Sequence, residues 1–568
     1  MHHSSKTFGL LLSLLLAVCL FGHIAQAKYA GSGMAASAQT STYVFVPDQS
    51  KLVQTGGIAG VHWTYSIKGQ FQVTVDPNAG SALFAHVDAN ATDDSPFKRT
   101  LDLNHVFNMT SLAGTLEPSG SIKFTGKAAD DSDVRITMSL QDHLAHLIGQ
   151  TTPPPNSADF FIFSLDAVAQ LCKYGGGSGT ADDPYQIATA ADLIALGETP
   201  EDYDKHFILT DDIDLGGKVF DKAVIAPDTD LTKFEFQGVP FTGVLDGNHH
   251  MILNFNCTSP DRDYVGLFGY VSGENVQIKD LGLIDPNVDA GTGRWIGSLV
   301  GEVRHGTISG CYAQGVSVKG KWHAGMLMGG NYGLVVACHS MGRVSGDYVV
   351  GGLIAYNGAR VTDCYSTGYV SGILPVGGLV GANYGGCSIV NCYSHSIVNG
   401  TGFFIGGLVG DNDGNIFNCY SIGNVFGGDA SFDSAGGLVG DNSGQITNCY
   451  SASLVTGMGD YVGGLVGKDF SCDWDCSYGR TVNSFWDTQT SGQATSAGGT
   501  GKTTAEMQMA STFLDAGWDF VNVWGIGENQ TYPYLRKYSA ADINQDASVN
   551  FLDLAVLAEK WLTDISHR

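Results

Sequence analysis

The stretch Gly406-Gly407-Leu408-Val409-Gly410, followed eight residues later by Asn418-Cys419-Tyr420-Ser421, decides the fold because both phrases recur along the chain. Neighbouring full copies of the glycine phrase are 26 to 30 residues apart, and the cysteine phrase follows each in nearly the same phase. Self-similarity at a fixed period indicates a repeat architecture. The glycine phrase or a near relative begins at Gly297, Gly325, Gly351, Gly377, Gly406, Gly436 and Gly463, with a shortened copy at Gly266; the cysteine phrase or a variant begins at Gly310, Ala337, Asp363, Asn391, Asn418 and Asn448.

A unit of about 27 residues with two or three short β segments cannot enclose a core alone. Stacking successive units about 4.8 Å apart satisfies their backbone hydrogen bonds and aligns like residues. The chain is therefore predicted to be mainly β, with a central right-handed parallel β-helix of about eight coils. A β-propeller is the competing interpretation, but its blades need about 40 residues or more.

These phrases, over about residues 260–485, resemble the GLUG repeat of bacterial secreted and surface proteins. The segment from Phe241 to Asn248 resembles the opening coil before such repeats. The resemblance implies a β-helical passenger region of the kind found in adhesins. It is a structural signature, so it implies no reaction.

Three columns of like residues are expected along the stacked coils. The asparagines after the glycine phrase are expected to form an amide ladder rather than a ligand site. The cysteines are expected to be buried reduced thiols, with a chain of disulfides as the alternative. The tyrosines could stack on sugar faces if they point outward or pack in the core if they point inward. The columns are Asn331, Asn357, Asn383, Asn412 and Asn442; Cys311, Cys338, Cys364, Cys392, Cys419 and Cys449; and Tyr312, Tyr365, Tyr393, Tyr420 and Tyr450.

Other parts of the chain predict three further segments. Residues 1–27 have an apolar run and Ala25-Gln26-Ala27, the pattern of a cleaved secretory signal. Residues 28–172 alternate with period two between turn residues, which predicts an antiparallel β-sandwich or barrel. Residues 180–535 then hold the β-helix with its caps, and residues 538–568 a short EF-hand-like helical segment.

The formal charge of −27 disfavours nucleic acid and anionic lipid as partners. After the signal, no run approaches the roughly 20 apolar residues of a membrane helix, so no transmembrane span is expected. We expect a secreted or cell-surface protein.

The segment from Asp542 to Asp553 has the spacing of a calcium-binding loop. Oxygen ligands stand at loop positions 1, 3, 5, 9 and 12, with a backbone carbonyl at position 7, and an apolar helix pattern follows. The predicted site holds one Ca²⁺. The segment resembles one half of a type I dockerin, with Ala547 where the family has a glycine, and the resemblance implies a cohesin-like partner. The predicted ligands are Asp542, Asn544, Asp546, Ser548 through its carbonyl, Asn550 and Asp553.

Function is predicted from these parts together. The leading hypothesis is a non-catalytic extracellular adhesion or carbohydrate-associated scaffold whose partner is a polysaccharide or a surface protein. The alternative is a polysaccharide-active β-helix lyase or hydrolase, because carboxylates could serve acid–base chemistry. Turn chemistry explains the same carboxylates equally well. The carboxylates concerned are Asp211, Asp212, Asp214 and Asp246.

Overall fold

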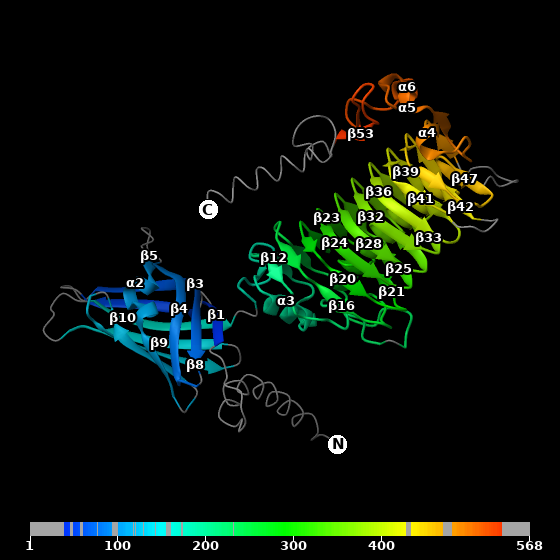
Figure 1. Cartoon of the computed structure of the whole chain (residues 1–568). Coiled ribbons are helices and arrows are strands. Elements are labelled where there is room, and N and C mark those ends of the chain that lie inside the picture. Colours follow the sequence, from blue (N-terminus) through cyan, green and yellow to red (C-terminus); the bar gives the residue numbers. More distant parts are fainter. Residues whose placement is uncertain are drawn as a thin grey trace, which may run out of the picture. The chain divides into compact units, whose positions relative to one another are not determined.

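The computed structural model describes residues 39–536, apart from 46–48, 57–60, 77, 94–99, 118, 120, 129, 142–143, 155–160, 172–173, 231, 428–432 and 470–479. The chain divides into two compact units after Ser178 (Figure 1). The predicted signal at 1–27 and the predicted calcium segment at 538–568 lie outside the described residues.

The first unit is a closed antiparallel barrel, which decides between the two folds expected for it. Eight strands run in the order β3-β2-β10-β9-β8-β7-β6-β4, and pairing of β3 with β4 closes the ring. Strand β1 also pairs with β3 and β10, and β5 pairs with β4. The strands are β1 (Gln39–Phe45), β2 (Lys51–Gly56), β3 (Val61–Asp76), β4 (Ser81–Asp93), β5 (Thr100–Asp102), β6 (Ala113–Leu116), β7 (Ile122–Lys127), β8 (Asp133–Gln141), β9 (Leu144–Thr152) and β10 (Phe161–Leu171).

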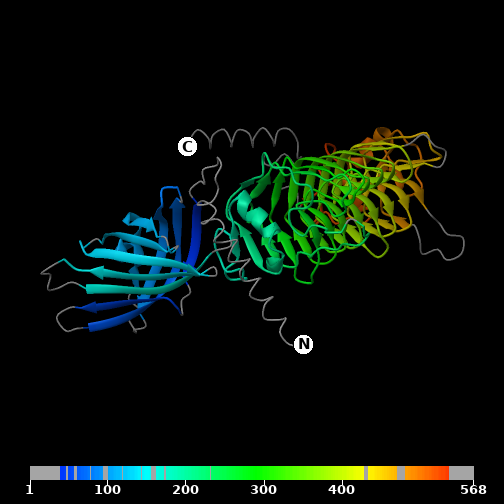
Figure 2. The same cartoon turned by 90° about the horizontal axis from the view of Figure 1, so that it is seen from below.

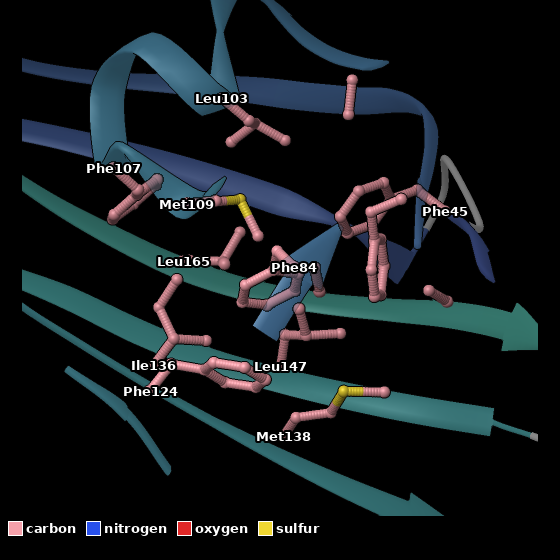
Figure 3. Close-up of a cluster of buried hydrophobic side chains, with 14 of the residues drawn as sticks. Phe45, Phe84, Leu103, Phe107, Met109, Phe124, Ile136, Met138, Leu147 and Leu165 are labelled. Carbon is pink, nitrogen blue, oxygen red and sulfur yellow. The ribbon is translucent and has the colours of Figure 1, made fainter. Parts of the chain in front are cut away.

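The barrel interior is filled by one side of each strand, as period-two patterning requires. In β8, Val134, Ile136 and Met138 are buried while the residues between them are exposed. Figure 3 shows Ile136 and Met138 converging with side chains of other strands and of helix α2 (Leu103–Phe107). Because side chains fill it, the barrel is a packed core rather than a channel.

The second unit is a parallel β-helix, which confirms the central prediction and rejects the propeller. A complete coil contributes to four sheets, here numbered in the order in which the chain meets them within that coil, and all pairings between coils are parallel (Figures 1 and 2). Sheet 4 contains eight strands, and the early coils add further strands to sheets 1 and 2. The repeated phrases fall in register, so that Tyr365 pairs with Tyr393 and Gly377 with Gly406.

The strands of the four sheets have the following bounds. Sheet 1 comprises β11 (Tyr185–Ile187), β12 (His206–Leu209), β14 (Val244–Asp246), β18 (Gln277–Lys279), β23 (Thr307–Ser309), β27 (Leu334–Val336), β31 (Arg360–Thr362), β35 (Ser388–Val390), β39 (Asn415–Phe417), β44 (Gln445–Thr447) and β49 (Arg480–Val482). Sheet 2 comprises β13 (Ile213–Asp214), β15 (Met251–Leu253), β16 (Asn256–Thr258), β19 (Gly282–Ile284), β20 (Asn287–Asp289), β24 (Tyr312–Lys319), β28 (His339–Ser345), β32 (Tyr365–Gly372), β36 (Tyr393–Gly400), β40 (Tyr420–Ser421), β41 (Asn424–Phe426), β45 (Tyr450–Ser451), β46 (Leu454–Thr456), β50 (Phe485–Asp487) and β51 (Thr500–Lys502). Sheet 3 comprises β21 (Arg294–Ile296), β25 (Trp322–Gly325), β29 (Tyr348–Gly351), β33 (Leu374–Gly377), β37 (Ile405–Gly406), β42 (Ser434–Gly436) and β47 (Tyr461–Gly463). Sheet 4 comprises β17 (Phe268–Val271), β22 (Val300–Val303), β26 (Met328–Asn331), β30 (Ile354–Asn357), β34 (Val380–Asn383), β38 (Val409–Asn412), β43 (Val439–Asn442) and β48 (Val466–Asp469).

The glycine phrase forms the corner between sheets 3 and 4, where the backbone is tightly packed. A Cβ atom on Gly406 would lie 1.8 Å from the Val409 carbonyl oxygen, and one on Gly407 would lie 2.1 Å from the Gly437 oxygen in the next coil. No side chain fits at either position. The repeated Gly-Gly pair is therefore a packing requirement of the stack.

Short helices flank the coils at both ends. At the N-terminal end, α3 (Ala190–Gly197) follows its N-cap Thr189, which forms a capping box with Asp192. Near the C-terminal end, the segment 504–536 packs on sheet 2 and is named the cap. The cap holds the helices α5 (Thr504–Met507) and α6 (Ala510–Leu514) and the strands β52 (Trp524–Gly525) and β53 (Tyr534–Leu535), and helix α4 (Thr488–Ser491) precedes it.

Candidate functional site

The predicted calcium ligands are not placed by the structure. Asp542, Asn544, Asp546, Ser548, Asn550 and Asp553 all lie outside the described residues.

The four aspartates considered for catalysis occupy turns and coil-to-coil contacts. Each accepts a hydrogen bond or forms an ion pair at 2.7 to 2.8 Å, as expected for residues that shape turns. Their oxygens therefore bind backbone amides or a lysine of the early coils. The partners are the Asp212 amide for Asp211, the Met251 amide for Asp212, the Gly216 amide for Asp214 and the Lys279 ammonium for Asp246.

The asparagine column forms the predicted amide ladder inside the corner between sheets 4 and 1. The amide of Asn357 donates to Asn383 at 2.8 Å, and that of Asn383 donates to Asn412 at 2.8 Å. The ladder continues to Asn442 and ends on Asp469. Because the five asparagines are buried and bonded to one another, they are structural residues.

The cysteine column lies inside the corner between sheets 1 and 2. Each of its thiols is fully buried, and the thiol of Cys364 donates to the Thr362 carbonyl at 3.1 Å and accepts from the Cys338 amide at 3.4 Å. Burial raises the pKa of the Cys364 thiol well above its usual value, so this thiol stays protonated. The predicted alignment and burial are confirmed, and the reduced state in solution stays a prediction.

The tyrosine column points outward from sheet 2 and includes His339 as its second member. Ring centroids of successive members are 4.6 to 5.0 Å apart, and the ring planes are within 6° of parallel. Each face of an inner ring is covered by a neighbour, so these faces are closed to a sugar. The column thus presents edges and hydroxyl groups, and it is named the aromatic ladder. Its members are Tyr312, His339, Tyr365, Tyr393, Tyr420 and Tyr450.

The cap covers the C-terminal members of the ladder. Tyr450 is fully buried and donates to the Pro533 carbonyl at 2.7 Å, while Trp524 packs within 6.2 Å of the ring centroids of Tyr420 and Tyr450. Towards Tyr312 the ladder members are partly exposed. The ladder therefore has one covered end and one accessible end.

The outward side of sheet 2 beside the ladder forms a distinct surface, named the ladder face. It comprises the outward side chains of β24, β28, β32, β36, β41 and β46, and these six strands contain no aspartate or glutamate. The chain as a whole has 56 acidic residues, so this composition sets the ladder face apart. Exposed apolar side chains on it are Met341, Tyr369, Ile397, Phe426 and Leu454.

At the centre of the ladder face, Tyr369 presents an accessible ring. It is 41% exposed, and its hydroxyl accepts a hydrogen bond from the Asn399 amide at 3.1 Å. In register, Arg343 precedes it and Ile397 follows it on neighbouring strands, and both are exposed. An aromatic ring beside an amide and a guanidinium can stack on a sugar and bond its hydroxyl groups.

The sequence analysis missed Tyr369, Arg343 and Asn399 because they lie outside the repeated phrases. Each follows the cysteine of its coil by five to seven residues, in the long strands whose outward positions vary. The alternation of those strands was the signal that could have shown which side chains face outward. The alternation alone does not predict the hydrogen bond between Tyr369 and Asn399, which lie 30 positions apart in the sequence.

None of the helices in the described part of the chain is long and apolar enough to cross a membrane.

Comparison with families of known proteins finds no family model that matches the chain. The solved structure of an IgA1 protease aligns over 87% of this chain and 33% of its own length, with 13% identity and a TM-score of 0.35. The chain is 34% identical over 139 residues to a putative Gly-rich membrane protein of Evansella cellulosilytica, and 34% identical over 149 residues to halomucin of Haloquadratum walsbyi. Each match covers 24% of this chain, with 12% of the first relative and 2% of the second, so the chain is similar to small parts of two much longer proteins.

Proposed function

We propose that the protein is a non-catalytic extracellular scaffold that binds polysaccharide along its ladder face. The observation that carries the proposal is the carboxylate-free ladder face with the exposed ring of Tyr369 beside the Asn399 amide. The surface presents apolar and hydrogen-bonding groups in a row along the stacked coils. Such a row fits an extended chain of sugars better than a compact ligand.

Three further points support this role. Residues 1–27 have the pattern of an export signal, and the two relatives are named as a putative Gly-rich membrane protein and as halomucin. The GLUG-like repeats belong to a family associated with adhesins. The early aspartates, on which a reaction would depend, are engaged in turns.

Retention of the purified chain on a panel of immobilised polysaccharides tests the proposal, with new reducing or unsaturated ends measured in the same samples. We expect retention without new ends. Replacing Tyr369→Ala should weaken retention about fivefold, because a stacked ring contributes about 1 kcal/mol. Tyr384→Ala is the matched control, since Tyr384 is 58% exposed and lies outside the ladder face, on the turn after β34.

Equal retention of the Tyr369→Ala and Tyr384→Ala variants would reject the ladder face as the binding surface. The appearance of new chain ends would show that the protein cleaves polysaccharide and would reject the non-catalytic role. Binding to surface proteins without binding to polysaccharides would reject polysaccharide as the ligand.

A further inference from the structure

A second unusual group lies on sheet 4, away from the ladder face. Glu302 is in β22 and pairs in register with Tyr270 of the preceding coil and with Gly330 of the following coil. It stands at the third position of its strand, which faces outward in this sheet, yet it is only 6% exposed. The side chains around it account for this burial.

Aromatic side chains surround the Glu302 carboxylate. A Cβ atom on Gly330 would lie 2.7 Å from the Trp295 ring and 3.3 Å from Cγ of Glu302, so both side chains occupy the space that Gly330 leaves. Burial and the nearby Glu302 charge together raise the pKa of Tyr264, Tyr270 and Tyr332. These four aromatic residues, with Glu302 and Arg304, are named the Glu302 cluster.

The Glu302 carboxylate makes no hydrogen bond and no close ion pair among the described residues. Its charged neighbour is Arg304, two residues away, which lowers the pKa of the carboxyl group against the effect of burial. The Arg304 guanidinium instead lies 4.6 Å from the centroid of the Tyr332 ring. A largely buried carboxylate without a hydrogen bond is unfavourable when ionised, because it loses the solvation that water provides.

The geometry points to the Glu302 cluster as a binding site for the ammonium group of an organic ligand. A carboxylate supplies the opposite charge, and aromatic rings attract a cation through their negative faces. Metal ions such as Ca²⁺ need six or more oxygen ligands, and the described part of the chain brings no group of three metal-binding side chains together. The inference goes beyond polysaccharide binding, because sheet 4 is a different face from sheet 2.

Ligand binding at this site should depend on pH. Burial raises the pKa of the Glu302 carboxyl to about 7, and Arg304 acts in the opposite direction. A cation binds to the ionised form, so affinity should be about 30-fold weaker at a pH 1.5 units below that pKa than well above it. The other ionisable groups in and around the cluster are Arg294, His323, Asp228, Asp263, Tyr264, Tyr270, Tyr332 and Tyr356.

Isothermal titration calorimetry of the whole chain with choline tests the inference. Choline should bind at pH 8.5, glucosamine should reveal whether a primary ammonium suffices, and the neutral isostere dimethylbutanol should not bind. Glu302→Gln should weaken choline binding at least tenfold, and Arg304→Met should strengthen it by removing a neighbouring positive charge. Glu274→Gln is the control, since Glu274 is exposed on the turn between β17 and β18.

Absence of choline binding at pH 8.5, equal binding of dimethylbutanol, or unchanged binding by Glu302→Gln would each overturn the inference. Circular dichroism of each variant checks that the β-helix is intact. Retention on polysaccharide is measured on the same variants, and its persistence in Glu302→Gln separates this site from the ladder face.

Discussion

At the residue scale, the cysteine column shows why one side chain is repeated at the same corner. The residue before each of these cysteines has a left-handed backbone, as Asn391 and Asn418 do with φ of 53°. The chain turns there, and the thiol then satisfies both the carbonyl behind it and the amide of the neighbouring coil. In the last coil Ser484 makes the same two bonds, to the Val482 carbonyl at 2.8 Å and from the Cys449 amide at 3.1 Å.

A hydroxyl should therefore replace a thiol in this column. We expect Cys392→Ser to be close to neutral and Cys392→Ala to lower the free energy of unfolding by about 1–3 kcal/mol, because alanine leaves a buried amide without its acceptor. Chemical denaturation followed by circular dichroism measures the difference. A serine variant less stable than the alanine variant would contradict the hydrogen-bonding role.

Residues differ in how far the sequence alone could place them. The asparagine and cysteine columns were predictable, since a fixed period puts like residues at like positions in every coil. The outward direction of the tyrosines was left open, because it depends on the left-handed corner at Asn391 and its equivalents. Glu302 was not predictable, since it lies beside Trp295 of sheet 3, a neighbour that the repeated phrases do not contain.

At the scale of elements, neighbouring strands β38 and β43 place two carboxyl groups in one outward column. Asp411 pairs with Asp441, which is 1% exposed and whose two oxygens have no hydrogen-bond partner in the described part of the chain. Burial raises the pKa of Asp411 to about 6, and burial with the Asp411 charge raises that of Asp441 to about 7. The remaining charged groups acting on the pair are Asp413, Lys468 and Asp469.

Raised carboxyl pKa values make the β-helix more stable in acid. A carboxyl group of the unfolded chain has a pKa of about 4, so the stabilisation is complete below that pH and is lost as the pH rises through about 7. We expect the midpoint of thermal denaturation to decrease as the pH is raised from 5 to 8. Asp441→Asn should flatten this dependence and be more stable than the unmodified chain at pH 8. A midpoint that rises over this range in both proteins would contradict the assignment.

The C-terminal segment is a separate element with its own prediction. We expect calorimetry of the whole chain to show one Ca²⁺ site, because the spacing from Asp542 to Asp553 supplies oxygen ligands at the positions of a calcium-binding loop. Asp542→Ala and Asp553→Ala should each weaken binding at least tenfold. Asp519→Ala is the control, since Asp519 lies in the cap and accepts hydrogen bonds from the Val521 and Asn522 amides. Equal binding by all four proteins would reject the site.

At the scale of the whole molecule, the cap limits how far the aromatic ladder is exposed. Its residues bury Tyr420 and Tyr450 together with Phe485, Trp518 and Trp524. Removal of residues 504–568 should expose a contiguous apolar patch, and such patches drive association. We expect this truncated chain to self-associate in sedimentation velocity. Removal of residues 537–568 alone is the matched control and should leave the sedimentation coefficient that of the monomer. Equal behaviour of the two truncations would show that the cap has no such role.

The parallel register of the coils has a consequence for the length of the molecule. Every column continues from one coil to the next, so loss or gain of one whole repeat would shift the two ends by one strand spacing of about 4.8 Å and leave each side chain on its own face. An insertion of one residue within a strand would turn all later side chains of that strand to the opposite face. The length of the β-helix can therefore change only in steps of one strand spacing, by duplication or deletion of whole repeats.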